Sequence, residues 1–475
     1  MFSAISASSV RRRGVTRLAA VALASGLMAM GTMAGAGAAS ADDAPQHQGG
    51  ASATLDGLTT FDNAVLHVKN GADQTVPAGL FEMTVDGGGK LKTYCIDIHN
   101  HTQSKAKYLE TPWDQTSLGT NKNAGKIRWI LQHSYPQVDD LSSLASSAGT
   151  GPLTEKTAAA GTQVAIWRYS DGVDIDAKDG QAEKLADWLE KSAQDVSEPK
   201  ASLTLSPAAV SGKVGEKLGP VTVNTDAASV AVTPPADSAT SGVKITDKDG
   251  KPVTTASNGT QLYFDVPAGA PEGSASLTVQ ATTSVSVGRA FASASKSQTQ
   301  ILAGSSDSTV TATATANWAK QGAIPAVSAA KDCAKGGVDV TVANKGDETF
   351  NFEISGAKHT VAAGASETIT VPVGEDEAYD IAVTGPNGFS QSFKGVLDCK
   401  TASAPAPTPS ADQPSSQPSA ASAGGTTSGT TGGDLAETGS SSATPMIAGI
   451  AIVLVVLGGG AVFFLRRKNS GATAE

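Results

Sequence analysis

Short runs of alternating apolar and polar residues in the second half of the chain constrain its fold more than any other feature. Between residues 199 and 400 they include LYFDV (262–266), SLTVQ (276–280), VDVTV (338–342) and FNFEI (350–354). Turn residues interrupt the runs at intervals of about a dozen residues, which is typical of strands that bury one face. The pattern predicts all-β domains of the immunoglobulin-like sandwich type.

This β-rich half divides at AIPAVSA (323–329). We expect one Ig-like sandwich over residues 199–320 and a second, smaller one over residues 329–400. Cys333 precedes the expected first strand of the smaller sandwich and Cys399 follows its last strand, so a disulfide between them would join its two ends. Two free thiols are the alternative, which an oxidising, extracellular location disfavours. Tandem sandwiches of this kind usually serve as spacers.

Residues 52–195 have a different composition and contain four of the five tryptophans of the chain. LFEMTVDGGGKLKTYCIDI (80–98) predicts a β-hairpin that turns at Gly87–Gly89, with Tyr94, Ile96 and Ile98 on one face of its second strand and Thr93, Cys95 and Asp97 on the other. Helical spacing of apolar residues follows within residues 124–136, 153–172 and 181–193, the second helix starting with Thr154 as its N-cap. The segment is therefore expected to be a mixed α+β domain.

The N-terminus has the features of an export signal. Arg11, Arg12 and Arg13 precede an apolar stretch over about residues 18–33, and Ala39-Ser40-Ala41 fits a cleavage site. We expect residues 1–41 to be a signal peptide cleaved after Ala41. The arginine run leaves twin-arginine export open, although the general secretory route is favoured.

The C-terminal region combines a low-complexity tract with an apolar segment. Residues 401–434 consist mainly of Pro, Ser, Thr, Ala and Gly, cannot bury a core, and are expected to form a linker that crosses the cell wall. Residues 446–465 carry no charge and are long enough to span a bilayer as a transmembrane helix. Basic residues follow at once and mark the cytoplasmic side.

LAETG stands just ahead of that apolar segment and resembles a sortase signal, with residues 435–475 providing pentapeptide, helix and basic tail. Ala436 replaces the commoner proline of the set Leu435, Ala436, Glu437, Thr438 and Gly439. The resemblance implies that sortase cleaves after Thr438 and joins Thr438 to an amine of a Gram-positive cell wall. Residues 446–465 would then contact the membrane only transiently. A permanent single-pass anchor is the alternative.

The remaining cysteine lies in YCID (94–97), and TQVAIW (162–167) follows it after the segment IRWILQHSYP. Together these motifs, which span most of residues 52–195, resemble the thioester domains, or TQxA domains, of Gram-positive surface adhesins. The resemblance implies an internal thioester between Cys95 and Gln163. It also implies a wall-anchored surface protein that attaches covalently to an amine-bearing target.

The residue types suit that chemistry. A cysteine thiolate can attack the side-chain amide of Gln163 and expel ammonia, which leaves a more reactive acyl group. An amine such as a lysine side chain would then take the acyl group and free Cys95. Because the protein is consumed, we expect no enzymatic turnover and no cofactor. Burial must exclude water, and Trp167 and Tyr94 are candidates for the shield.

Two other functions remain open. In the first, the protein is an inert wall or coat protein and Cys95 is itself a silent buried thiol, since lone cysteines on strands are often small buried residues. A cysteine hydrolase would need His99 or His101 beside Cys95, but no local peptidase signature is present. No acidic or cysteine cluster supports a metal site at these histidines. Asp97 either polarises the site or ends the strand.

The overall charge excludes one class of partner. The 475-residue chain has a formal net charge of −10. An acidic chain of this kind is not attracted to nucleic acid or to anionic lipid.

Overall fold

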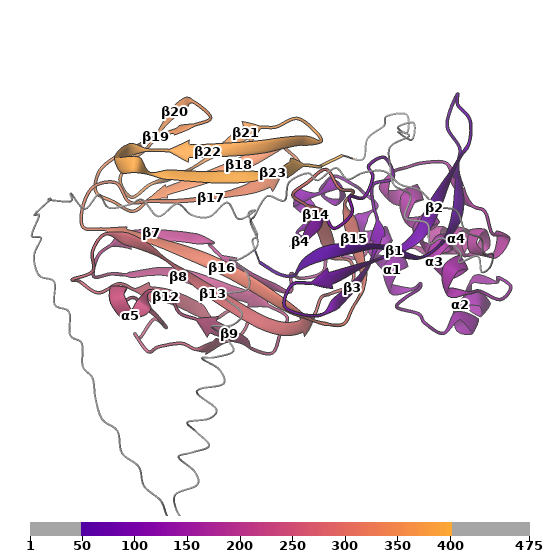
Figure 1. Cartoon of the computed structure of the whole chain (residues 1–475), viewed down its shortest axis with the longest axis horizontal. Helices are drawn as coiled ribbons and strands as arrows, with labels where there is room; N and C mark the ends of the chain where they lie inside the picture. Colours follow the sequence, from indigo (N-terminus) through magenta and orange to yellow (C-terminus); the bar gives the residue numbers. More distant parts are fainter. Residues whose placement is uncertain (1–48, 401–475) are drawn as a thin grey trace, which may run out of the picture. The chain divides into compact units, whose positions relative to one another are not determined.

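The computed structural model describes residues 49–400 (Figure 1). The expected signal peptide, the linker 401–434, the LAETG segment and the apolar segment 446–465 lie outside the described residues. Within residues 49–400, every helix is too short or too polar to cross a membrane.

The N-terminal part of the described chain is built on a seven-stranded sheet with the order β2-β3-β15-β14-β4-β1-β5. The strands are β1 (Ser52–Leu66), β2 (Gln74–Val85), β3 (Lys90–Cys95), β4 (Lys107–Thr111), β5 (Ile175–Ala177), β14 (Ala290–Ser293) and β15 (Gln300–Ser305). The hairpin expected between residues 80 and 98 is confirmed as β2 and β3, which pair antiparallel. Its turn contains Gly87, Gly88 and Gly89, all with positive φ, which suits glycine.

Four helices follow β4, and three of them are those expected from the sequence. They are α1 (Ala124–Gln132), α2 (Leu141–Ala148), α3 (Glu155–Ser170) and α4 (Gly180–Ser192), preceded by the 3₁₀ turns η1 (Trp113–Gln115) and η2 (Ser117–Gly119). Thr154 caps α3 as expected, in a capping box with Thr157. Sequence analysis missed α2, whose serine-rich sequence has low helix propensity and whose N-cap is Asp140.

The position of α3 depends on a close contact with α4. A Cβ added at Gly161 would lie 2.4 Å from the carbonyl oxygen of Ala182, so only glycine permits this helix spacing. Helix α3 also contacts β1, β2 and β3, and eleven of its sixteen residues are buried. The TQVAIW motif therefore lies on a helix enclosed by the sheet and a second helix.

The expected boundary between the first two domains is wrong in one respect. The hairpin β14–β15, inside the segment 199–320 assigned to a sandwich, pairs instead with the first sheet: β14 with β4, and β15 with β3. Figure 1 shows these four strands side by side. Alternation marks a strand but does not identify the strand it will pair with, so sequence reasoning had no basis for moving this hairpin.

The middle segment otherwise forms two sheets, with orders β10-β12-β8-β6 and β11-β9-β13-β16-β7. The strands are β6 (Leu203–Ser206), β7 (Ala209–Lys213), β8 (Lys217–Thr225), β9 (Val230–Thr233), β10 (Lys244–Thr246), β11 (Thr255–Ala256), β12 (Gln261–Asp265), β13 (Gly273–Ser284) and β16 (Asp307–Ala319), with a short helix α5 (Ser238–Ser241). β13 and β16 pair along their whole lengths. The chain therefore leaves these two sheets at the end of β13, forms β14 and β15 in the first sheet, and returns at the start of β16.

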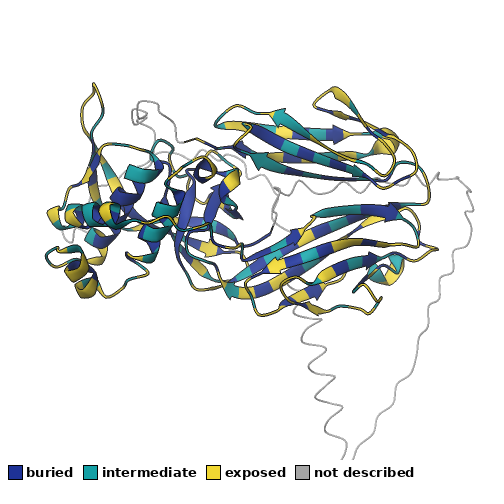
Figure 2. Ribbon diagram, turned by 180° about the vertical axis from the view of Figure 1, so that it is seen from behind, coloured by how far each residue is buried: buried dark blue, intermediate teal, exposed yellow. Residues whose placement is uncertain are grey.

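The C-terminal segment also consists of two sheets, β17-β18-β21 and β20-β19-β22-β23. Its strands are β17 (Pro325–Asp332), β18 (Gly337–Asn344), β19 (Phe350–Ile354), β20 (Ala357–Val361), β21 (Ser366–Pro372), β22 (Glu377–Thr384) and β23 (Ser390–Leu397), with the 3₁₀ turn η3 (Pro386–Gly388). Apolar residues of both sheets share one core, and Figure 2 shows buried and exposed residues alternating along these strands. This is a two-sheet sandwich; its immunoglobulin-like topology stays a prediction.

The expected limits of this sandwich need a correction, although its disulfide is confirmed. The first strand begins at Pro325, ahead of residue 329, so Cys333 follows that strand instead of preceding it. Cys333 and Cys399 are bonded as expected. The strand starts inside AIPAVSA, where the segments were divided, and its first residue is a proline, which is tolerated at the first position of a strand.

A buried ion pair joins β4 to the segment before β14. Arg289 donates through Nε to Glu110 Oε1 at 2.9 Å and through Nη1 to Glu198 at 2.6 Å. Glu110 also accepts hydrogen bonds from the backbone N–H groups of Ala51 and Ser202. Glu110 and Arg289 are 4% and 3% exposed, so Glu110 depends on Arg289 to compensate its charge, and Arg289 depends on Glu110 and Glu198.

We predict that Glu110→Gln lowers the free energy of unfolding by about 3–5 kcal/mol, because it removes the buried carboxylate and leaves the Arg289 charge paired only with the partly exposed Glu198. Urea unfolding of a protein comprising residues 49–400 measures this loss of stability. The matched control is Lys335→Ala, which breaks an ion pair whose lysine is 54% exposed and should cost at most about 1 kcal/mol. Equal losses in the two variants would contradict a special role for the buried pair.

Candidate functional site

Cys95 is the last residue of β3 and is fully buried. The strand ends at Cys95, before the expected residue 98, and Thr93, Tyr94, Cys95, Ile96 and Asp97 are all buried. The strand lies inside the sheet between β2 and β15, and α3 also contacts it. A strand covered on both faces loses the two-sided pattern of a half-exposed strand.

The polar backbone groups of Cys95 face away from β15. Ile96 donates its N–H to the carbonyl of Thr299 at 3.1 Å, and Cys95 is the register partner of Gln300. In an antiparallel ladder, hydrogen-bonded and non-hydrogen-bonded pairs alternate, so the N–H and C=O of Cys95 point to the opposite side of β3. Pairing with β2 on that side has already ended at Thr93.

The side-chain amide of Gln163 occupies this open position. Cys95 N–H donates to Gln163 Oε1 at 3.0 Å, and Gln163 Nε2 donates to Cys95 O at 2.8 Å. Gln163 is fully buried on α3. The structure thus brings together the two residues of the expected thioester, 68 positions apart in sequence, and holds the Gln163 amide in one orientation.

The sulphur of Cys95 lies in the turn that follows β3. Asp97 donates its N–H to Sγ at 3.2 Å, and Sγ is 3.1 Å from the carbonyl oxygen of Asp97. Burial raises the pKa of the Cys95 thiol well above its usual value, and the nearby carboxyl groups of Asp171 and Asp97 raise it further. A free Cys95 is therefore held as a thiol in this environment.

Asp97 and Asp171 shape the turn. Asp97 is 1% exposed and accepts hydrogen bonds from the backbone of His99 and from the backbone and side chain of Asn100. Asp171 caps the end of α3 and accepts from Ile98 N at 2.9 Å and from Ser170 Oγ. Burial raises the pKa of Asp97, and it raises the pKa of Asp171 to about 7. Asp97 therefore both ends the strand and places a carboxyl group beside the site.

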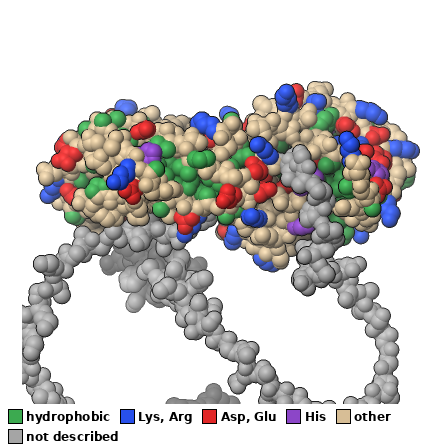
Figure 3. Space-filling view, turned by 90° about the horizontal axis from the view of Figure 1, so that it is seen from above, with side chains coloured by type: hydrophobic (Ala, Val, Ile, Leu, Met, Phe, Trp, Pro, Cys, Tyr) green, Lys and Arg blue, Asp and Glu red, His purple; other side chains and the backbone are tan. Residues whose placement is uncertain are grey.

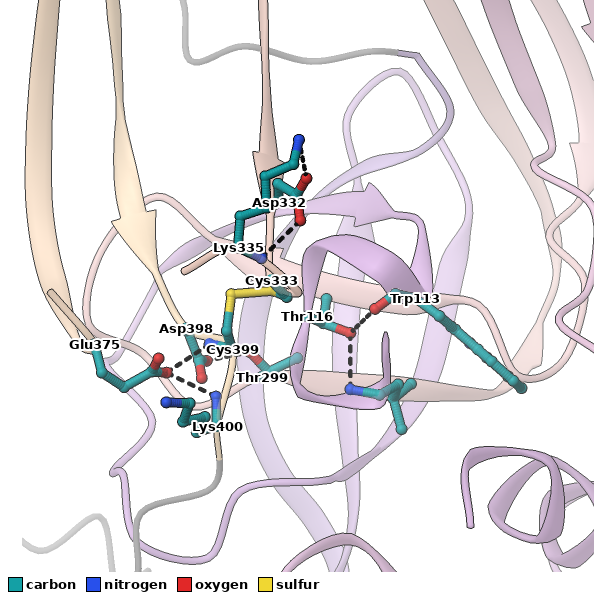
Figure 4. The surroundings of a disulfide bond; sticks show 11 residues. Trp113, Thr116, Thr299, Asp332, Cys333, Lys335, Glu375, Asp398, Cys399 and Lys400 are labelled. Carbon is teal, nitrogen blue, oxygen red and sulfur yellow. Dashed lines mark hydrogen bonds and ion pairs between the residues drawn. A yellow bond between two sulfur atoms is a disulfide. The ribbon is translucent and has the colours of Figure 1, made fainter. Parts of the chain in front are cut away.

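The loop between β14 and β15 covers the same turn and was missed from the sequence. Gln298 donates through Nε2 to Asp97 O at 2.7 Å, and Ser297 and Gln298 both bond the buried hydroxyl of Tyr108. Thr299 donates to Asp398, next to the disulfide (Figure 4). The only available signal was a run of polar residues, SKSQTQ, within a segment of strand-like alternation.

The aromatic residues expected to shield the site are buried there. Tyr94 is fully buried and donates its hydroxyl to Tyr135 O at 2.7 Å. Trp167 is 4% exposed and lies one helical turn after Gln163 on α3. In contrast to Tyr94, its indole Nε1 has no hydrogen-bond partner within residues 49–400.

The histidines are not arranged as a dyad with Cys95. In the described part of the chain, His99 Nδ1 is buried without a partner, and neither His99 nor His101 hydrogen-bonds the cysteine through its ring. Burial lowers the pKa of His99. A hydrolase mechanism would need a base aligned with the sulphur.

Three carboxyl groups lie together at the end of the C-terminal sandwich. Ligand atoms of Glu375, Asp376 and Asp398 all fall within 4.8 Å of one another. Glu375 accepts hydrogen bonds from the backbone N–H groups of Cys399 and Lys400 (Figure 4). Exposed acidic groups commonly gather in this way without an ion, so the expectations of no metal and no cofactor stay predictions.

Residues 92–197 match the family model described as a thioester domain. The matched segment contains both Cys95 and Gln163. A second match, over residues 325–396, is to a family described as the C-terminal domain of bacterial phospholipase C, and it covers the C-terminal sandwich.

Comparison with solved structures gives distant likenesses. The chain is 16% identical to the Bacillus anthracis TIE protein over 73% of this chain and 63% of that one, with a TM-score of 0.27. It is also 16% identical to the thioester domain of the Enterococcus faecium TIE86 protein, covering 57% of this chain and 97% of that one, with a TM-score of 0.28. The chain thus spans less than two-thirds of the Bacillus protein's length. No curated protein matches.

We predict that Asp171→Asn raises stability at neutral pH but not at acid pH. Because burial raises the pKa of Asp171 in the folded chain to about 7, above its ordinary value of 3.8, the folded chain binds this proton more tightly than the unfolded chain. The stability that this bound proton contributes to the folded chain is therefore lost as the pH rises from 3.8 to about 7. The variant should match its parent near pH 4 and exceed it by about 1–3 kcal/mol above pH 7.

Urea unfolding across this pH range measures the effect. Parent and variant both carry Cys95→Ala, so that no covalent bond to Gln163 contributes. A difference between them that does not change with pH would contradict the assignment.

Proposed function

We propose that Cys95 and Gln163 form an internal thioester through which the protein attaches covalently to an amine-bearing target. The observation that supports this most directly is the pair of hydrogen bonds between the Gln163 amide and the Cys95 backbone, inside a segment that matches the thioester domain family. The protein would then be a surface adhesin, each molecule of which reacts once.

Formation of the bond requires attack by the sulphur on Gln163 Cδ. The Cδ–Nε2 bond breaks, the thiol proton goes to the leaving nitrogen, and ammonia departs. Cys95 N–H, 3.0 Å from Oε1, donates to the oxygen on which negative charge develops, so it serves as an oxyanion donor. Loss of Nε2 removes the hydrogen bond to Cys95 O, whereas the bond to Oε1 can persist.

Transfer to the target follows the same geometry. A primary amine attacks Gln163 Cδ, the Cδ–Sγ bond breaks, and an amide joins Gln163 to the target while Cys95 returns to the thiol. Full burial of Cys95 and Gln163 keeps water from competing. Each molecule reacts once and is not regenerated, so the protein is not an enzyme in this scheme.

The rest of the chain would display this domain on a Gram-positive cell. The export signal, the linker and LAETG support secretion, sortase cleavage after Thr438 and attachment to the cell wall. The two β-rich segments would hold the thioester domain away from the wall. On the face shown in Figure 3, acidic and basic side chains are interspersed, so this face does not present the continuous basic surface that binds nucleic acid.

One observation favours a second candidate. Cys95 is fully buried, as it would be in an inert wall or coat protein with a silent thiol. The hydrolase alternative has less support, because neither nearby histidine is aligned with the sulphur in the described residues.

The intact mass of the secreted chain, residues 42–438, tests the proposal. A thioester predicts a deficit of about 17 Da from lost ammonia, beyond about 2 Da for the disulfide, and methylamine should then add about 31 Da. Cys95→Ala and Gln163→Ala should each abolish both changes. A wild-type mass that shows only the disulfide would reject the thioester and leave the inert protein as the better account.

A further inference from the structure

The unpaired indole N–H of Trp167 is a buried polar group that shielding alone does not explain. The residue is 4% exposed, and Nε1 has no hydrogen-bond partner within residues 49–400. An unsatisfied buried donor costs about 1–3 kcal/mol, and such groups in native structures call for a reason. Phenylalanine would exclude water at the same place without this cost.

The position of Trp167 on α3 brings it to the reacting atoms. Residues four apart on a helix share a face, so Trp167 lies beside Gln163, whose amide contacts Cys95. Burial raises the pKa of the Cys95 thiol, and the nearby Trp167 side chain acts in the opposite direction by favouring the thiolate. Trp167 is thus close enough to Cys95 to act on its sulphur, although Nε1 makes no hydrogen bond within the described residues of the resting structure.

The other groups around the sulphur make a thiolate costly. Asp171 and Asp97 both disfavour negative charge on Sγ, and the N–H of Asp97 is its backbone donor. Release of Cys95 as a thiolate in this buried environment, close to two carboxyl groups, therefore needs a further hydrogen-bond donor.

Building on the proposed function, we propose that Trp167 is a catalytic residue whose Nε1–H donates a hydrogen bond to Cys95 Sγ as the sulphur leaves the acyl group. The amine nitrogen forms its bond to Gln163 Cδ, the Cδ–Sγ bond breaks, and the electron pair stays on sulphur. The proton lost by the nitrogen ends on the sulphur and restores the thiol.

The unpaired state of the donor before reaction is what makes it effective. A thioester sulphur is a weak acceptor, whereas a thiolate is a strong one. The hydrogen bond is therefore stronger in the transition state than in the ground state, which is the condition for accelerating a reaction. The same donor would favour the attacking thiolate when the thioester first forms.

Trp167→Phe separates the donor role from shielding, because the two roles predict opposite changes in the rate of aminolysis. The starting material is protein that shows the mass deficit of the thioester, and the measurement is the rate constant for methylamine addition by mass spectrometry. Loss of a transition-state donor should slow aminolysis by about 10- to 100-fold, with hydrolysis slowed as well. Loss of a shield would instead speed both reactions.

Trp113→Phe is the matched control. Trp113 is similarly buried, but its Nε1 donates to Gly288 O at 2.8 Å. This substitution should lower the melting temperature and leave the aminolysis rate unchanged, whereas Trp167→Phe should lower the melting temperature less because it removes no satisfied hydrogen bond. Aminolysis of the Trp167→Phe thioester at or above the wild-type rate would overturn the proposal.

A second variant covers the case in which Trp167→Phe folds but shows no mass deficit. Benzothienylalanine at position 167 keeps the shape of the indole and replaces N–H by sulphur. Slow or failed thioester formation in this isostere supports the donor role, and wild-type formation and aminolysis rates overturn it. A wild-type chain without the mass deficit would instead reject the proposed function itself.

Discussion

The site depends on where the backbone pairing of β3 stops. Pairing with β2 ends at Thr93, while pairing with β15 continues to Cys95. This leaves the N–H and C=O of Cys95 buried and unpaired by any strand, a costly condition for backbone groups. The Gln163 amide satisfies both, so the requirement that stabilises the fold also sets the reactive pair in place.

The elements around this contact keep it in register. Gly161 allows α3 to approach α4 closely, and the hydrogen bond from Ile98 N to Asp171 ties the end of α3 to the turn after β3. The β14–β15 loop closes over the same turn through Gln298. Helix, turn and loop thus meet at Cys95 from three distant parts of the sequence, and together they bury Cys95 and Gln163.

For the proposed reaction, this arrangement combines a poorly reactive free thiol with a donor already in place. Burial and two carboxyl groups hold free Cys95 as a thiol, so the chain does not present an exposed nucleophile. Cys95 N–H already donates a hydrogen bond to the side-chain carbonyl oxygen of Gln163, on which negative charge develops in the proposed acyl transfer. Preorganised donors of this kind need no rearrangement when the reaction occurs.

The sequence alone determined the hairpin at Gly87–Gly89, the capped helix after Thr154 and the Cys333–Cys399 disulfide, because turn, cap and export signals are local. The motifs also indicated Cys95 and Gln163 as a pair. Only the tertiary structure decided that β14–β15 completes the first sheet, that β3 is covered on both faces and that Trp167 is left without an acceptor. Each of these depends on which distant segments pair or pack, and the period of a strand or helix does not specify its partner.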